Sequence, residues 1–274
     1  MPAVHLNRLE AEIRYLVKQF DEPERFIPTL TELFERYASW SFRPGKLVHD
    51  NIQIPQYHLP DIVMQKLSQA LRPYCRENLP ATRRLAALLW KGEYYEHRLF
   101  AILLLSMLPL EDPNIFMEKM QEWIHSESET RLHADLFSTG CRELRAAYPA
   151  LWLEYTENWT TSEDVKEQAL GLQALTASLN DPGFKHVPNL FRLSTDLMRT
   201  APLPLLTFLQ ELLEAMLKRS PSETIFFLQQ LLVRGASDNS ARLIRRQLPR
   251  LPRETQVTLR TLLNDRQKKD VDAP

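Results

Sequence analysis

The chain has 274 residues, of which 44% are hydrophobic and 25% charged, a balance typical of folded proteins. Its net charge is −1, and its two cysteines, Cys75 and Cys141, exclude a disulfide framework and a four-cysteine zinc site. The apolar stretch from Leu99 to Leu110 is interrupted by Ser106 and Pro109 and is shorter than the roughly 20 residues that cross a bilayer. With no membrane span and no signal-peptide pattern, we expect a cytoplasmic protein.

Glycine and proline usage predicts an all-α protein. Six glycines are too few for the many tight turns of a β-rich chain, and the nineteen prolines recur as though each closed a helix. Asp112-Pro113 and Asp181-Pro182 each place a capping oxygen beside a residue that suits the first helical turn. Ser220-Pro221-Ser222-Glu223 adds a capping box. These signals predict many helices joined by short turns.

Apolar residues recur at helical spacing along most of the chain, as in the stripe Leu6, Leu9, Ile13 and Leu16. In chain order the expected helices cover residues 5–20, 22–38, 58–76, 79–91, 93–108, 113–125, 128–147, 149–159, 162–180, 186–199, 203–219, 221–234, 239–248 and 253–266. Residues 40–57 form the longest irregular stretch, which we expect to be an ordered loop.

Helices of this length, punctuated by prolines at the spacing of a helix pair, indicate an all-α, HEAT-like solenoid of stacked antiparallel helix pairs. We expect one domain over residues 1–274, with a disordered tail at about 267–274 and a concave binding surface. The segment 93–108 is apolar on every side, which predicts a place in the middle of the stack. Four tryptophans at apolar helix ends should pack between helices, in preference to forming a stacking surface: Trp90, Trp123, Trp152 and Trp159.

Two stretches, "NIQIPQYHLPDIVMQKL" and "LWKGEYYEHRLFAILLLSML", resemble the AlkD family of alkylpurine DNA glycosylases, which are HEAT-like repeat proteins. The shared elements are an Ile-x-x-Pro segment before a helix, a Leu-Trp pair, a short acidic turn and an Ala-Ile pair in the next helix. In this chain they are Ile52 to Pro55, Leu89-Trp90, Glu93 with Glu96, and Ala101-Ile102. The likeness spans about residues 45–250 and implies the fold and a DNA-repair function.

The segment that corresponds to the family's catalytic residues departs from the family pattern. Residues 131–135, Arg-Leu-His-Ala-Asp, stand where the family has Trp-Asp-x-Val-Asp, so the resemblance implies Asp135 as the catalytic carboxylate. Arg131 replaces one pocket tryptophan, and the second falls near Glu211, which is not aromatic. A carboxylate that stabilises a cationic nucleoside would therefore lack its aromatic partners. The alternative reading of Asp135 is a solvent-facing helix residue.

A basic cluster lies near the C-terminus, where residues 234–274 hold ten Lys or Arg against five Asp or Glu. Arg242, Arg245 and Arg246 share one face of an expected helix, with Arg250 and Arg253 beyond it. The forked guanidinium groups suit phosphate contacts, and Arg131 and Lys166 are further candidates. The alternative is a solvated cap at the end of the stack.

Two functions remain open from these residues. The first is a DNA-binding protein related to alkylpurine glycosylases, with base excision lost or altered and resting, if present, on Asp135. The second is a HEAT-type scaffold that binds another protein and no nucleic acid. No glycine-rich phosphate loop, nucleophile motif or Cys/His cluster occurs, so we expect no cofactor and no metal.

Overall fold

The computed structural model describes residues 5–38 and 54–271 and, among them, the side chains up to residue 266. These residues form helices and connecting turns, with no strand among them. The chain divides into two compact units, residues 1–143 and 144–274. Most of the expected loop at 40–57 lies outside the described residues. The single domain and the tail at 267–274 stay predictions.

Unit 1, residues 1–143, is built from helices, several of which begin at or near prolines or capping side chains. They are α1 (Leu6–Val17), α2 (Pro23–Tyr37), α3 (Asp61–Glu77), α4 (Leu79–Trp90), α5 (Tyr95–Leu105), α6 (Pro113–Ser126), α7 (Thr130–Asp135) and the π-helical turn η1 (Leu136–Gly140). Helix α8 (Arg142–Ala147) contains the boundary with unit 2.

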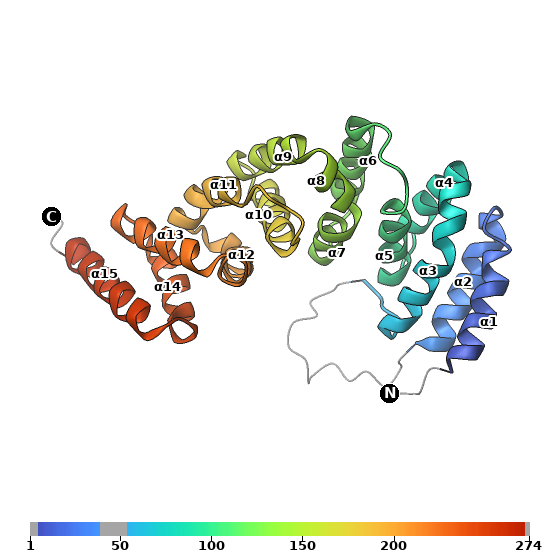
Figure 1. Ribbon diagram of the computed structural model, residues 1–274, viewed down its shortest axis with the longest axis horizontal. Coiled ribbons are helices and arrows are strands. Elements are labelled where there is room, and N and C mark those ends of the chain that lie inside the picture. The colour runs from blue at the N-terminus through green and yellow to red at the C-terminus, as the bar shows by residue number, and fades with distance from the viewer. Residues whose placement is uncertain (1–4, 39–53, 272–274) are drawn as a thin grey trace. The chain divides into compact units, whose positions relative to one another are not determined.

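Unit 2, residues 144–274, continues with further helices (Figure 1). They are α9 (Pro149–Thr161), α10 (Val165–Asn180), α11 (Val187–Thr200), the short η2 (Leu203–Leu205), α12 (Leu206–Arg219), α13 (Pro221–Val233), α14 (Asp238–Gln247), the short η3 (Leu248–Arg250) and α15 (Arg253–Val271).

The helices of each unit stack in two layers. In unit 2, α9, α11, α13 and α15 pack side by side in one layer, and α10, α12 and α14 in the other (Figure 1). In unit 1, α1, α3, α5 and α7 form one such row, and α2 packs on α4. The apolar stripe of each helix is therefore covered by the next helix in the chain and by the helix two positions along. The all-α fold of stacked helix pairs is confirmed, and its assignment as HEAT stays a prediction.

The expected helix at 128–147 is wrong as a single element, because the chain forms α7, the π-helical turn and α8 there. The N–H of Cys141 donates to the carbonyl of Leu136, five residues earlier, at 2.9 Å, which widens the helix locally. Gly140 permits this packing, since a Cβ at that position would lie 2.9 Å from Leu136 Cδ1. The interruption directly follows Asp135.

Of the expected helix starts, the one at Asp112 is confirmed, because its Oδ1 accepts the N–H of Asn114 at 2.8 Å. The start at Asp181 is wrong: α10 ends there, and the Asp181 carboxylate pairs with the buried guanidinium of Arg145 at 3.0 Å. Helix α13 does begin after Ser220, but the Ser220 side chain makes no capping hydrogen bond. Proline geometry therefore starts α13 without the capping box.

The core follows the expected pattern. Helix α5 lies between α4 and α7 and buries side chains all round, among them Phe100, Ile102 and Leu104. The expected packing of the tryptophans is confirmed, since all four are at most 7% exposed. Trp90 and Trp123 stack face to face, with ring centroids 4.5 Å apart. None of the helices that the structure describes is long and apolar enough to span a membrane.

Candidate functional site

The start of α5 is fixed by the segment that precedes α3. The buried Glu96 carboxylate accepts the backbone N–H groups of Tyr57 at 3.0 Å and His58 at 2.8 Å. The rings of Tyr57 and Tyr94 stack 4.1 Å apart, and the N–H of Tyr95 donates to the carbonyl of Pro55 at 2.9 Å. A buried carboxylate that is satisfied by backbone donors holds its segment firmly. Glu96, which matched the AlkD pattern, therefore positions the first turn of α5.

Helix α7 is held against α5 by an ion pair that is mostly removed from water. Arg98 of α5 donates to Glu127, whose side chain is 5% exposed, and to the carbonyl of Gly92 at 2.7 Å. The other Glu127 oxygen accepts the N–H groups of Ser128 and Glu129, each at 2.7 Å. This arrangement fixes the turn from which α7 begins.

The two positioned helices bring Tyr95 of α5 against Asp135, the last residue of α7. The Tyr95 hydroxyl donates a hydrogen bond to Oδ2 of Asp135, and Tyr95 is 5% exposed while Asp135 is half-buried. The exposed Arg131, one turn earlier on α7, places its guanidinium 5.3 Å from the centre of the Tyr95 ring. Asp135 is therefore not simply a solvent-facing aspartate: it belongs to a cluster with Tyr95 and Arg131.

Burial raises the pKa of Asp135, while the hydrogen bond from Tyr95 and the charge of Arg131 act in the opposite direction. Burial also raises the pKa of Tyr95, and the neighbouring carboxylate of Asp135 raises it further. Tyr95 therefore stays protonated and donates to Asp135. The carboxylate has one oxygen engaged by a hydroxyl and a cation beside it, which together reduce the negative potential it can offer to a bound cation.

Unit 2 carries the second group of candidate residues, on and after α14. Arg242, Arg245, Arg246, Arg250 and Arg253 are all exposed. The opposite face of α14 is buried, as the spacing predicted, with Leu243 3% and Ile244 0% exposed. The arginine side chains of α14 thus form one solvent-facing row. Together with Arg250 and Arg253 they make up the arginine row.

The arginine row is only partly engaged by neighbouring side chains. Arg250 forms an ion pair with Glu214 of α12 at 2.8 Å, and Arg246 donates to the neutral amide of Gln210 at 3.1 Å. Arg242 and Arg245 act on Asp238 only through their charge, whereas Arg266 bonds it at 2.8 Å. Within the described part of the chain, Arg242, Arg245 and Arg253 donate no hydrogen bond, so their guanidinium groups are available to a ligand.

The remaining predicted residues are both exposed in unit 2: Lys166 in the first turn of α10, and Glu211 on α12. Asp135 and Arg131 belong to unit 1, whereas Lys166 and the arginine row belong to unit 2. Sequence reasoning missed Tyr95, because it stands 40 residues before Asp135 and the acidic and aromatic residues around it gave no sign of the pairing. It also missed Glu214 as the partner of Arg250.

No group of three or more potential metal-ligating side chains occurs among the described residues. The fold and the two groups of residues define an all-α helical-repeat protein with a carboxylate cluster in one unit and an arginine row in the other.

A sequence-family model described as DNA alkylation repair enzyme matches residues 60–247, which include Tyr95, Asp135 and all of α14. The chain belongs to this family, which confirms the resemblance drawn from its sequence and gives it a DNA-repair-related role. Neither the curated proteins nor the solved structures contain a match to the chain.

Proposed function

We propose that the protein binds duplex DNA through its sugar-phosphate backbone and that base excision is lost or altered. The arginine row supplies the main contacts, with Arg131 and Lys166 as further cations. The observation that carries this proposal is a row of exposed arginines, three of them without a hydrogen bond in the described structure, in a member of a DNA-repair family. One guanidinium group can donate hydrogen bonds to two phosphate oxygens at once, and each phosphate that it neutralises releases counterions condensed on the DNA.

The altered activity follows from the Asp135 cluster. A carboxylate accelerates N-glycosidic cleavage when its charge stabilises the cation that develops on the nucleoside. Here Asp135 accepts a hydrogen bond from Tyr95 and lies near the positive charge of Arg131, which opposes a second cation. Neither Arg131 nor Glu211 offers an aromatic face to a cationic base.

DNA binding is tested by fluorescence anisotropy with a labelled duplex at a series of salt concentrations. Each phosphate contact should contribute about 0.9 to the slope of log affinity against log salt. Arg242→Gln, Arg245→Gln and Arg246→Gln combined should flatten the slope and weaken binding. Arg260→Gln, which removes an exposed arginine of α15 outside the row, is the matched control and should change little. Absence of duplex binding by the native protein at low salt would contradict the proposal.

Base excision is tested separately, by incubating the protein with methylated duplex DNA and measuring free 3- or 7-methylpurine. We expect little or no release from the native protein. Rapid release that Asp135→Asn abolishes would show instead that the family's excision chemistry is retained and depends on this carboxylate.

A second candidate function, a scaffold that binds another protein, is favoured by one observation. An apolar groove of about 690 Å³ lies between α11 and α13 of unit 2, and DNA binding would not use it. Duplex binding at low salt distinguishes the two functions, since a scaffold with no nucleic-acid role would not bind the duplex.

A further inference from the structure

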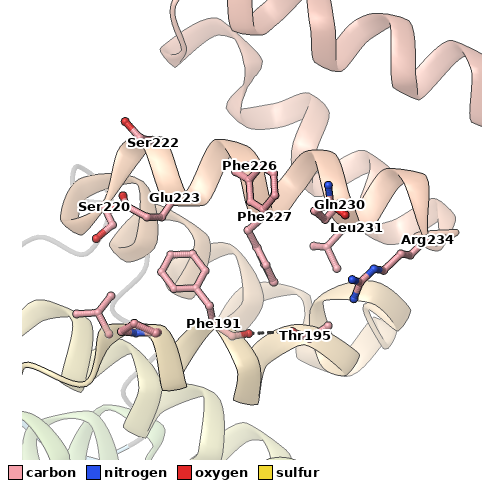
Figure 2. A pocket seen from close by; sticks show the side chains of 12 residues that line it. Phe191, Thr195, Ser220, Ser222, Glu223, Phe226, Phe227, Gln230, Leu231 and Arg234 are labelled. Atoms are coloured by element: carbon pink, nitrogen blue, oxygen red, sulfur yellow. Dashed lines mark hydrogen bonds between the residues drawn. The ribbon is translucent and has the colours of Figure 1, made fainter.

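The groove between α11 and α13 has an aromatic floor. Phe191 of α11 and Phe227 of α13 meet edge to face, with ring centroids 5.4 Å apart, and Leu231 continues the floor along α13 (Figure 2). The hydroxyl of Thr195 donates to the carbonyl of Phe191 within α11, so it is satisfied inside its own helix. The middle of the groove therefore offers a ligand apolar contacts and few hydrogen bonds.

One edge of the groove exposes a large apolar side chain. Phe226 of α13 lines the groove and is 62% exposed to solvent. The exposed phenylalanine ring and the aromatic floor beside it form an apolar surface that is in contact with water and that a bound partner would cover. Val233, on the same helix and 66% exposed, does not line the groove and provides a comparison.

The two ends of the groove carry opposite charges. Glu223 lies at one end and Arg234 at the other (Figure 2). Neither side chain forms an ion pair or hydrogen bond with any residue that the structure describes. Glu223 in the first turn of α13 and Arg234 just after its end are eleven positions apart, which corresponds to about 16 Å, or three helical turns. The groove thus combines an apolar centre with an unpaired anion at one end and an unpaired cation at the other.

We propose that this groove binds an amphipathic helix of a partner protein. The helix has large apolar side chains on one face over about three turns, a basic residue at the end near Glu223 and an acidic residue at the end near Arg234. The groove walls are two helices, and a third helix packs into such a surface by placing its side-chain ridges between theirs.

The residues that line the groove include none of the arginine row. The groove lies in the layer formed by α9, α11, α13 and α15, whereas α14, which carries Arg242, Arg245 and Arg246, packs in the other layer of unit 2. Substitution of an uncharged groove residue, such as Phe226→Ser, should therefore leave duplex affinity unchanged, and failure of one proposal leaves the other standing.

The test uses three fluorescein-labelled, stapled helical peptides of about 15 residues, long enough to span the groove. All share the same apolar face, with leucine or phenylalanine at positions i, i+3, i+4 and i+7. One carries lysine at one end and glutamate at the other, the second lysine at both ends and the third glutamate at both ends. By anisotropy, the full-length protein should bind the mixed-charge peptide about fivefold more tightly than either of the others, since each exposed ion pair contributes modestly.

Variants of the groove should change this preference in a defined way. Arg234→Glu should favour the peptide with lysine at both ends, and Glu223→Lys the peptide with glutamate at both ends. Phe226→Ser should weaken binding of all three peptides, while Val233→Ser, an equally exposed change on the same helix, should not. Arg260→Glu, outside the groove, controls for the overall charge of the protein. Circular dichroism verifies that each variant folds.

Three outcomes would overturn the proposal. The first is that no peptide binds. The second is that peptides bind with no dependence on Phe226 or on the two end charges. The third is a concentration-dependent dimer, seen by analytical ultracentrifugation, that Phe226→Ser dissociates, which would make the occupant a second copy of the chain.

Discussion

The Tyr95 hydroxyl donates a hydrogen bond to Asp135 Oδ2 and so joins the first residue of α5 to the last residue of α7. The bond engages the carboxylate that the family resemblance singled out. Because Asp135 is half-buried, its protonation is coupled to folding, and this coupling can be measured.

Asp135→Asn should change stability in a pH-dependent way. Burial raises the pKa of Asp135 above the ordinary value of an aspartate, so between the two pKa values the folded protein keeps a proton that the unfolded chain has already lost. The carboxylate's contribution to the free energy of unfolding therefore falls as pH rises from the unfolded pKa through the folded pKa. Relative to the native protein, the amide variant should gain stability across this window and level off above it.

Urea denaturation at a series of pH values measures this difference. Tyr95→Phe provides a second comparison, because loss of the hydroxyl removes a hydrogen bond that favours the charged form of Asp135. The pKa of Asp135 should therefore rise further, and the pH range over which stability changes should extend to higher pH. A stability difference that is flat across the acid range would show that Asp135 titrates alike in both states.

Glu127→Gln should destabilise the protein by about 3 kcal/mol, because it leaves the largely buried guanidinium of Arg98 without its counter-charge. Urea denaturation at neutral pH gives the free energy of unfolding. The matched control is Glu122→Gln, which removes an exposed partner of Lys119 and should cost about 0.5 kcal/mol or less. Equal effects of the two changes would mean that the Arg98 pair contributes no more than a surface ion pair.

Glu214→Gln should strengthen duplex binding, because it releases Arg250 from its ion pair and removes a negative charge beside the arginine row. We expect affinity to rise about two- to fivefold and the salt slope to steepen by up to about 0.9, the contribution of one added phosphate contact. Anisotropy titrations measure both quantities. The double variant Glu214→Gln with Arg250→Gln should lose the steeper slope, and weaker binding by the single variant would argue against Arg250 as a phosphate contact.

Gly171→Ala should destabilise unit 2, although alanine favours a helix interior over glycine by about 1 kcal/mol. A Cβ on Gly171 would lie 2.7 Å from Thr160 Cγ2 and 2.9 Å from the Thr160 backbone nitrogen, so α9 and α10 would have to separate. Overpacking of this kind costs about 1–3 kcal/mol, which outweighs the gain in propensity. Thermal unfolding measures the balance, and a stabilised variant would show that the two helices separate at little cost.

Helix content, the burial of the tryptophans and the solvent-facing side of α14 could all be predicted from sequence. Each depends on residues within a few turns of one another, where the period of 3.6 residues decides which side chains share a face. The interruption at 136–140 could not, because its turn packs against a distant helix: a Cβ on Gly140 would lie 3.4 Å from Cγ2 of Ile102 in α5.

Asp181 shows where local reasoning fails. The dipeptide Asp181-Pro182 has the form of a helix start, yet the carboxylate pairs with Arg145, 36 residues earlier, and caps no helix start. Leaving a buried guanidinium without a counter-charge lowers the free energy of unfolding by more than leaving a helix start without a cap, so the ion pair with Arg145 prevails.

By itself, the sequence determined the all-α class, the family and the residue types available for phosphate contact. The tertiary structure alone decided which of those residues are engaged: Tyr95 with Asp135, Glu214 with Arg250, and the apolar rings of α11 and α13 facing one groove. These partners stand dozens of residues apart in the chain. Helical periodicity fixes the face of each side chain, but only the packing of one helix on another fixes what that face meets.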